Sequence, residues 1–242
     1  MKKLYAKSEL WFSLVWIIAY VVLFSLADSI SSVLGAEKLI TAPVAAALTI
    51  FLLVWLGRNG LFAKYGLARV VIDHKQYLYY LPLLVLISTN LWGGIALWLS
   101  PVETALYVIS MIGVGILEEV IFRGFLFQAL CKDNFKTAVV ISSVTFGIGH
   151  IVNLLNGANF LPTLLQIIYA TAAGFLFTIL FHKSGSLLPC IVTHCAINSL
   201  SAFSAQRAPT LDYVAAAVLT VLALLYAVWI LKKSKNSPLL TL

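Results

Sequence analysis

Eight long apolar stretches run through the chain, and they restrict the folds open to it more than any other feature. They lie at residues 10–27, 39–57, 78–99, 104–130, 137–152, 163–181, 186–203 and 212–231. A helix needs about 20 apolar residues to cross the hydrocarbon core of a bilayer. Because 62% of the residues are hydrophobic and 10% are charged, the sequence predicts an all-α, polytopic membrane protein with about eight transmembrane helices. The fifth and seventh stretches are short, as in helices packed inside a bundle.

Basic residues are distributed unevenly between the loops. If there are eight spans, both termini and every second loop lie on one side of the membrane. That side carries thirteen basic residues: Lys2, Lys3, Lys7, Arg58, Lys64, Arg69, Lys75, Lys132, Lys136, Lys183, Lys232, Lys233 and Lys235. The other side carries Lys38 and Arg207. Cytoplasmic loops are enriched in Lys and Arg, so we expect both termini to be cytoplasmic, and we interpret the net charge of +7 as a topology signal, not as evidence for nucleic-acid binding.

No linker or repeat divides the chain, so we expect one transmembrane domain over residues 1–242, with its motif-bearing core at about 104–203. The first apolar stretch follows three lysines but has no small-residue cleavage pattern, which favours an uncleaved first helix. The cysteines, Cys131, Cys190 and Cys195, are expected to be buried, reduced thiols.

Charged residues interrupt the fourth apolar stretch, where "EEVIFRGF" spans residues 118–125. A charge at the bilayer centre costs roughly 2.5 to 3.5 kcal/mol on insertion scales, so these side chains need partners. Arg123 follows Glu119 by four residues, and the two can form an ion pair on one helix face. Glu118 points about 100° away, which leaves its carboxyl group free for another role.

Two further polar patterns lie within apolar stretches. "FGIGH" ends in His150, and its glycines, Gly147 and Gly149, would allow close helix approach. "HCAIN" places His194 and Asn198 four residues apart, on one helix face. Taken singly, such residues are more often interhelical hydrogen-bond partners than catalysts.

Depth distinguishes the group from isolated hydrogen bonds. Counted from the nearest basic loop at about 1.5 Å per residue, Glu118, His150, His194 and Asn198 all lie about 16 to 22 Å into the membrane. A carboxylate and an imidazole that reach one water can act as a general base. A second imidazole and a carboxamide can donate hydrogen bonds to an oxyanion, so the set fits peptide-bond hydrolysis.

These motifs, in this order, resemble the EExxxR, FxxxH and HxxxN motifs of the CPBP family, which unites CAAX prenyl endopeptidases with bacteriocin-processing and immunity (Abi) proteins. The resemblance implies an intramembrane endopeptidase in which Glu118 and His150 activate water, while His194 and Asn198 form the oxyanion site. It implies supporting roles for Glu119 and Arg123, and an all-helical bundle whose cavity opens toward the cytoplasmic side. Phe146 is either a pocket-shaping neighbour of His150 or simply part of the core.

Several alternatives remain open. Zinc held by Glu118, His150 and His194 is the nearest rival to a metal-free mechanism without cofactors, although the chain has no HExxH helix. Cys195 adjoins His194, but neighbouring helix residues point about 100° apart, which argues against a thiol nucleophile. A proton- or ion-coupled transporter would also use buried carboxylates, and a non-catalytic immunity or scaffold protein could use the same fold.

The expected partners are a membrane-associated peptide or protein substrate and the lipid bilayer. The compact loops favour a prokaryotic plasma membrane, where prenylated substrates would be less common. No motif in the sequence selects a substrate, a cleavage site or an oligomeric state.

Overall fold

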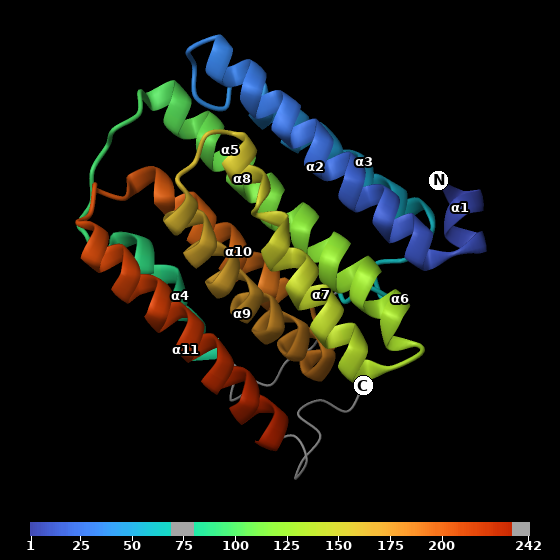
Figure 1. Ribbon diagram of the computed structural model, residues 1–242. Helices are drawn as coiled ribbons and strands as arrows, with labels where there is room; N and C mark the ends of the chain where they lie inside the picture. The colour runs from blue at the N-terminus through green and yellow to red at the C-terminus, as the bar shows by residue number, and fades with distance from the viewer. Residues whose placement is uncertain (69–79, 234–242) are drawn as a thin grey trace.

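The computed structural model describes residues 1–68 and 80–233, which form a bundle of packed helices (Figure 1). Within these residues, six helical segments are long and apolar enough to cross a membrane. They are α2 (Glu9–Val33), α3 (Thr41–Arg58), Pro101–Cys131, Phe135–Leu155, α9 (Phe160–Ser184) and α11 (Pro209–Lys233). Two shorter apolar segments, Leu81–Leu91 and Leu188–Phe203, correspond to the third and seventh apolar stretches. The predicted polytopic membrane bundle is therefore confirmed.

The sequence predicted that the fifth and seventh stretches are short. In the structure the two short segments come from the third and seventh stretches. The short segment of the third stretch consists of α4 (Leu81–Ser88) and the 3-10 turn η2 (Thr89–Leu91), after which residues 92–100 leave the helix. Gly94 adopts a φ of 102°, and Ile95 forms an isolated antiparallel bridge with Ser204. A Cβ at Gly93 would lie 2.1 Å from the Arg207 side chain, so the glycine pair lets the chain pass close to the segment before α11. The fifth stretch is longer than expected, because α8 (Val152–Leu155) follows α7 (Phe135–Gly149) almost directly.

Local sequence signals set several helix ends. Ser8, after the short helix α1 (Lys2–Lys7), accepts a hydrogen bond from the backbone of Trp11 and caps α2. Ser100 and Glu103 form a reciprocal capping box at the start of α5 (Pro101–Glu118). Gly185 ends α9 in the left-handed conformation, with a φ of 66°. The remaining elements are η3 (Glu119–Phe127), α6 (Gln128–Cys131), α10 (Leu188–Leu200) and η4 (Ser201–Phe203).

Small residues bring three pairs of helices into close contact. A Cβ at Gly147 of α7 would lie 1.9 Å from Oγ1 of Thr171 in α9, and one at Gly113 of α5 would lie 2.9 Å from the Ala45 side chain in α3. Gly115 meets α10 in the same way. The prediction that Gly149 allows close helix approach is wrong, since a Cβ there would meet nothing within 4 Å.

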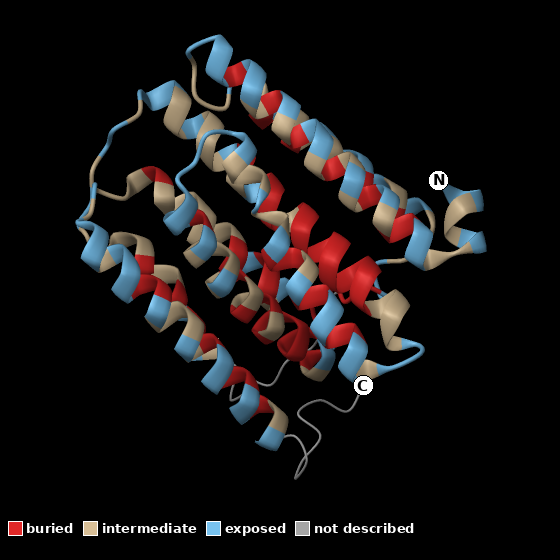
Figure 2. Ribbon diagram, in the orientation of Figure 1, coloured by how far each residue is buried: buried red, intermediate tan, exposed pale blue. Residues whose placement is uncertain are grey.

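The core is filled unevenly along the bundle. Buried residues concentrate around η3 and the neighbouring parts of α9 and α10 (Figure 2). Toward the end that carries the N-terminus, Phe125 of η3 packs in edge contacts against Phe12 and Tyr65, with ring centroids 5.1 and 5.0 Å apart. Aromatic packing closes this end, whereas the opposite half of the bundle contains a cavity.

All three cysteines are free, as predicted, but their burial differs. Cys190 is buried, whereas Cys131 and Cys195 are partly accessible. The residues Arg69, Lys75 and Lys235, used above to predict the topology, lie outside the described part of the chain.

Candidate active site

The charged motif occupies a change of helix type. The helix Pro101–Cys131 is α-helical up to Glu118 and becomes a π-helix over η3, from Glu119 to Phe127. π-Helical turns are rare, and they occur frequently at functional sites. The change falls between the two adjacent glutamates, where both carboxyl groups are directed toward the same imidazole in α10.

Glu119 and Arg123 form a fully buried ion pair. Arg123 Nη1 donates to Glu119 Oε1 over 3.0 Å, and neither side chain has any exposed surface. The guanidinium also lies 4.0 Å from the centroid of the Phe146 ring, a favourable cation–π position. The spacing of four residues predicted this pair, and Phe146 gives it an aromatic cover.

Phe146 also contacts both histidines of the motifs. Its ring makes edge contacts with His150 and His194, with centroids 5.6 and 5.8 Å apart. Phe146 lies on the cavity wall and is 5% exposed, so it is part of the core and also shapes the site.

The imidazole of His194 lies between the two carboxyl groups. Its Nδ1 is 2.8 Å from Glu119 Oε1, and its Nε2 is 3.4 Å from Glu118 Oε2. A carboxylate paired with a guanidinium can only accept hydrogen bonds. Nδ1 of His194 therefore carries the hydrogen and donates a hydrogen bond to Glu119. This bond fixes the ring orientation and turns Nε2 toward Glu118 and the cavity.

The second glutamate faces the same imidazole from the cavity side. Glu118 Oε2 and His194 Nε2 lie 3.4 Å apart, and both residues line the cavity. A water in the cavity can therefore reach both groups.

Tyr20 is a contact of Glu118 that sequence reasoning missed. Its hydroxyl donates to Glu118 Oε1 over 2.7 Å, and the tyrosine is 8% exposed in α2. One carboxyl oxygen of Glu118 is thus held by Tyr20, while the other faces His194. The sequence offers a weak signal at best, a tyrosine in an otherwise apolar span, 98 residues away from its partner.

Tyr20, Glu118 and His194 lie at the floor of a cavity of about 500 Å³, a volume within the range of small-ligand sites. Glu118, His150, His194 and Asn198 all line this cavity, so the three motifs meet in space. His150 is the C-cap of α7, and Asn198 belongs to the last turn of α10, four residues beyond His194.

The cavity lies in the half of the bundle away from the described chain ends. Its wall includes the second half of α2, the second half of α5, the end of α7, the middle of α9 and the end of α10. Cytoplasmic termini and a cavity that opens to the cytoplasm therefore cannot both hold. The depth estimated from the sequence agrees with this placement. A site about 21 Å from the surface at the basic loops, in a hydrocarbon core of ~30 Å, lies closer to the opposite surface.

Among residues 1–68 and 80–233, no group of three or more His, Cys, Asp or Glu side chains is arranged to hold a metal ion. The zinc set considered above, Glu118, His150 and His194, lines one cavity, but Nδ1 of His194 already bonds to Glu119.

Comparison with known proteins supports the resemblance that the motifs indicate. Residues 98–200 match the family model described as "Type II CAAX prenyl endopeptidase Rce1-like". A stretch of 93 residues is 37% identical to the "Putative membrane peptidase YdiL" of Bacillus subtilis (strain 168). This alignment covers 38% of the chain and 34% of the relative, so the match spans about a third of the relative's length. No solved structure matches the chain.

Proposed function

We propose that the chain is an intramembrane endopeptidase of the CPBP family that hydrolyses a peptide bond of a membrane-associated peptide or protein. The match of residues 98–200 to the Rce1-like family model and the similarity to a putative membrane peptidase support this proposal. The observation that carries the proposal is the placement of Glu118. Its carboxyl group lies at the cavity floor, bonded to Tyr20 and facing His194, with His150 on the same cavity wall.

In the proposed reaction, Glu118 and His150 bind a water and Glu118 takes its proton as the oxygen attacks the peptide carbonyl. Asn198 and Nε2 of His194 face the developing oxyanion, which a hydrogen-bond donor stabilises. When the C–N bond breaks, Glu118 returns the proton to the leaving amine. Glu119 and Arg123 keep the His194 ring in place and do not touch the substrate.

The test is a comparison of membrane peptides by mass spectrometry from cells that produce the wild type or Glu118→Gln. Gln has nearly the same shape, keeps an acceptor for the Tyr20 hydroxyl and cannot take a proton at neutral pH. General-base catalysis contributes about 10²- to 10⁴-fold, so we expect the products present with the wild type to disappear with Glu118→Gln. Glu37→Gln, a change of the same chemistry on a more exposed glutamate, should leave the products in place.

Identical peptide sets from wild type and Glu118→Gln would contradict the proposal. A scaffold or immunity protein would retain its biological effect in Glu118→Gln, and a transporter would produce substrate-driven pH changes in proteoliposomes. Cleavage that depends on Glu118 separates the peptidase from both alternatives.

A further inference from the structure

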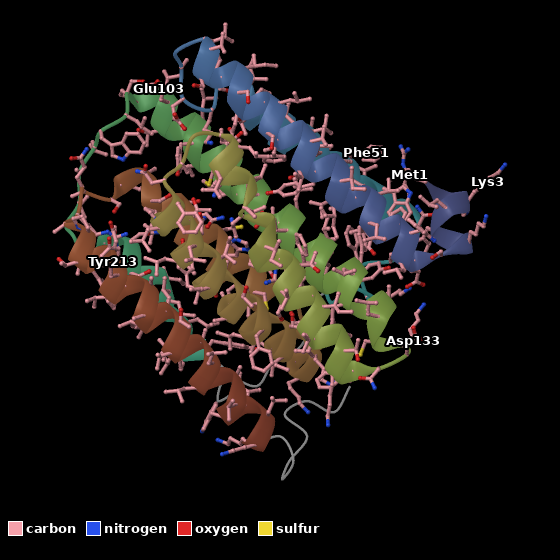
Figure 3. All side chains as sticks on the ribbon, viewed as in Figure 1. Met1, Lys3, Phe51, Glu103, Asp133 and Tyr213 are labelled. Atoms are coloured by element: carbon pink, nitrogen blue, oxygen red, sulfur yellow. The ribbon has the colours of Figure 1, made fainter. Side chains whose placement is uncertain are left out.

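The two ends of the bundle carry opposite net charge. The end that holds the N-terminus and the end of α11, here called the basic end, carries ten basic residues among the described positions: Lys2, Lys3, Lys7, Arg58, Lys64, Lys132, Lys136, Lys183, Lys232 and Lys233. Its acidic residues are Glu9 and Asp133. Figure 3 places Met1, Lys3 and Asp133 at this end and Glu103 and Tyr213 at the other.

The opposite end, here called the cavity end, carries more acidic than basic residues. Its described acidic side chains are Asp28, Glu37, Glu103 and Asp212, and its basic ones are Lys38 and Arg207. Most of these charges are paired with one another. Lys38 Nζ lies 2.9 Å from Asp28, and Arg207 Nε lies 2.9 Å from Asp212.

The cavity extends from the site to the cavity end. Along α2 its wall runs from Tyr20 to Asp28, and in α5 it runs from Glu118 back to Tyr107. Just after α8 it reaches Asn156, which is exposed. At the basic end, by contrast, the core beyond Glu118 is closed by buried aromatic rings such as Phe125.

We propose that the cavity end faces the extracytoplasmic side and that the site receives a peptide presented from there, uncharged next to the cleaved bond. Lys and Arg are retained on the cytoplasmic side of membrane proteins, which orients the basic end toward the cytoplasm. The site then lies nearer to the outer surface. The orientation rests on charge and cavity placement alone, whereas the peptide part also rests on the proposed function.

The cavity lining favours an uncharged occupant. Four carboxamides, Asn90, Asn153, Asn156 and Gln166, line it above the site. Asn90 donates to the Ile197 carbonyl and Asn153 donates to Gln166, and the remaining donors and acceptors of the four can bond to a peptide main chain. Apart from Glu118, the Asp and Lys side chains in the described lining are Asp28 and Lys38, and these neutralise each other. A charged substrate side chain would lose its water here, and outside the site residues Glu118, His150 and His194 the described lining offers it no unpaired charge.

Cysteine labelling in intact cells tests the orientation without any need for activity. The parent protein carries Cys131→Ser and Cys195→Ala, and single cysteines are added as Asn156→Cys at the cavity end or Lys136→Cys at the basic end. Both positions are exposed. With a membrane-impermeant maleimide outside the cells, we expect Asn156→Cys to be labelled at once and Lys136→Cys only after permeabilisation.

The reverse pattern, or equal labelling of both positions from outside, would overturn the orientation whether or not the protein is a peptidase. Labelling after permeabilisation shows that each cysteine is reactive, so failure to label from outside is interpretable.

A second measurement tests the substrate side of the proposal. Once the peptide comparison has identified a cleaved sequence, Lys or Asp is placed beside the cleaved bond, with Asn at the same position as the control. We expect kcat/KM to fall at least about tenfold for Lys and Asp relative to Asn. Equal cleavage of the three peptides would overturn the uncharged-substrate inference, while loss of all cleavage in Glu118→Gln separately tests the proposed function.

Discussion

His194 and Glu119, 75 residues apart in sequence, are joined by a hydrogen bond of 2.8 Å inside the bundle. The same carboxyl oxygen of Glu119 accepts from Arg123 at 3.0 Å. Glu119 therefore connects the first and third motifs, and its charge serves both partners at once. The arrangement gives the second glutamate of the motif a defined task, namely to set the tautomer and direction of the His194 ring.

Removing Arg123 alone should destabilise the protein strongly. Arg123→Met leaves Glu119 buried without its cation, and breaking a buried pair costs about 3–5 kcal/mol. Replacing both members, as Glu119→Gln with Arg123→Met, removes the unpaired charge, so we expect much of this stability to return. The midpoint of thermal unfolding in detergent micelles measures both effects. Lys132→Met, at a more exposed pair with Glu9, should cost about 1 kcal/mol or less.

The double variant also separates stability from activity. With its stability restored, it should still cleave poorly, because Nδ1 of His194 no longer has a carboxylate to hold it. Full activity in the double variant would show that the charge of Glu119 supports folding only.

Tyr20→Phe should lower activity without disturbing the fold. The change removes the hydroxyl that donates to Glu118 and keeps the ring packed near Phe24, whose centroid is 4.5 Å away. A hydrogen bond to a charged group is worth about 1.5–3 kcal/mol, so we expect kcat to fall by about tenfold or more. Tyr213→Phe on exposed α11 serves as the matched control. An unchanged kcat for Tyr20→Phe would mean that the bond has no part in positioning Glu118.

The sequence contained enough information to predict the local part of the site. The spacing of four between Glu119 and Arg123 predicted their contact, because helical periodicity brings such residues together. Equal depth in the membrane predicted that His150 and His194 approach Glu118, and all three line one cavity. The roles of these residues in catalysis remain predictions.

The parts that were missed depend on packing between distant helices. Tyr20 carries no pattern that marks it as a partner of Glu118, since it lies within an apolar run of α2. The π-helix has no signature in "EEVIFRGF", and it alters the helix phase on which the separation of Glu118 from Glu119 was argued. The exit of residues 92–100 from the helix follows from contacts with the segment before α11, including Arg207 of that segment.

Gly147 and Gly149 offer a matched pair for testing helix packing. In Gly147→Ala the new Cβ would lie 2.8 Å from the Ile167 backbone oxygen and 2.9 Å from the Thr171 backbone nitrogen. Backbone atoms cannot move aside cheaply, so α7 and α9 must separate, and overpacking of this kind costs about 1–3 kcal/mol. Gly149→Ala meets open space and should leave the unfolding midpoint unchanged or slightly raised. Equal stability of the two variants would contradict the close approach at Gly147.

Cys195→Ala should remain active. The thiol donates to the Ile112 carbonyl at 3.4 Å and packs against Gly115, and Cys195 is not among the described residues that line the cavity. An alanine keeps the small volume that this contact requires. Cleavage rates of Cys195→Ala and wild type at equal protein concentration give the comparison, and complete loss with normal folding would revive the thiol nucleophile.

Prolonged treatment with a strong chelator should leave cleavage unchanged. A catalytic zinc ion needs about three protein ligands and an open position for water. Nδ1 of His194 bonds to Glu119, which leaves Nε2 as its nitrogen for a metal, and no group of three His, Cys, Asp or Glu side chains among the described residues is arranged to hold one. Activity is measured after chelation and dialysis, and again after separate additions of zinc and cobalt. Recovery of lost activity by either metal would contradict the metal-free mechanism and favour Glu118, His150 and His194 as ligands.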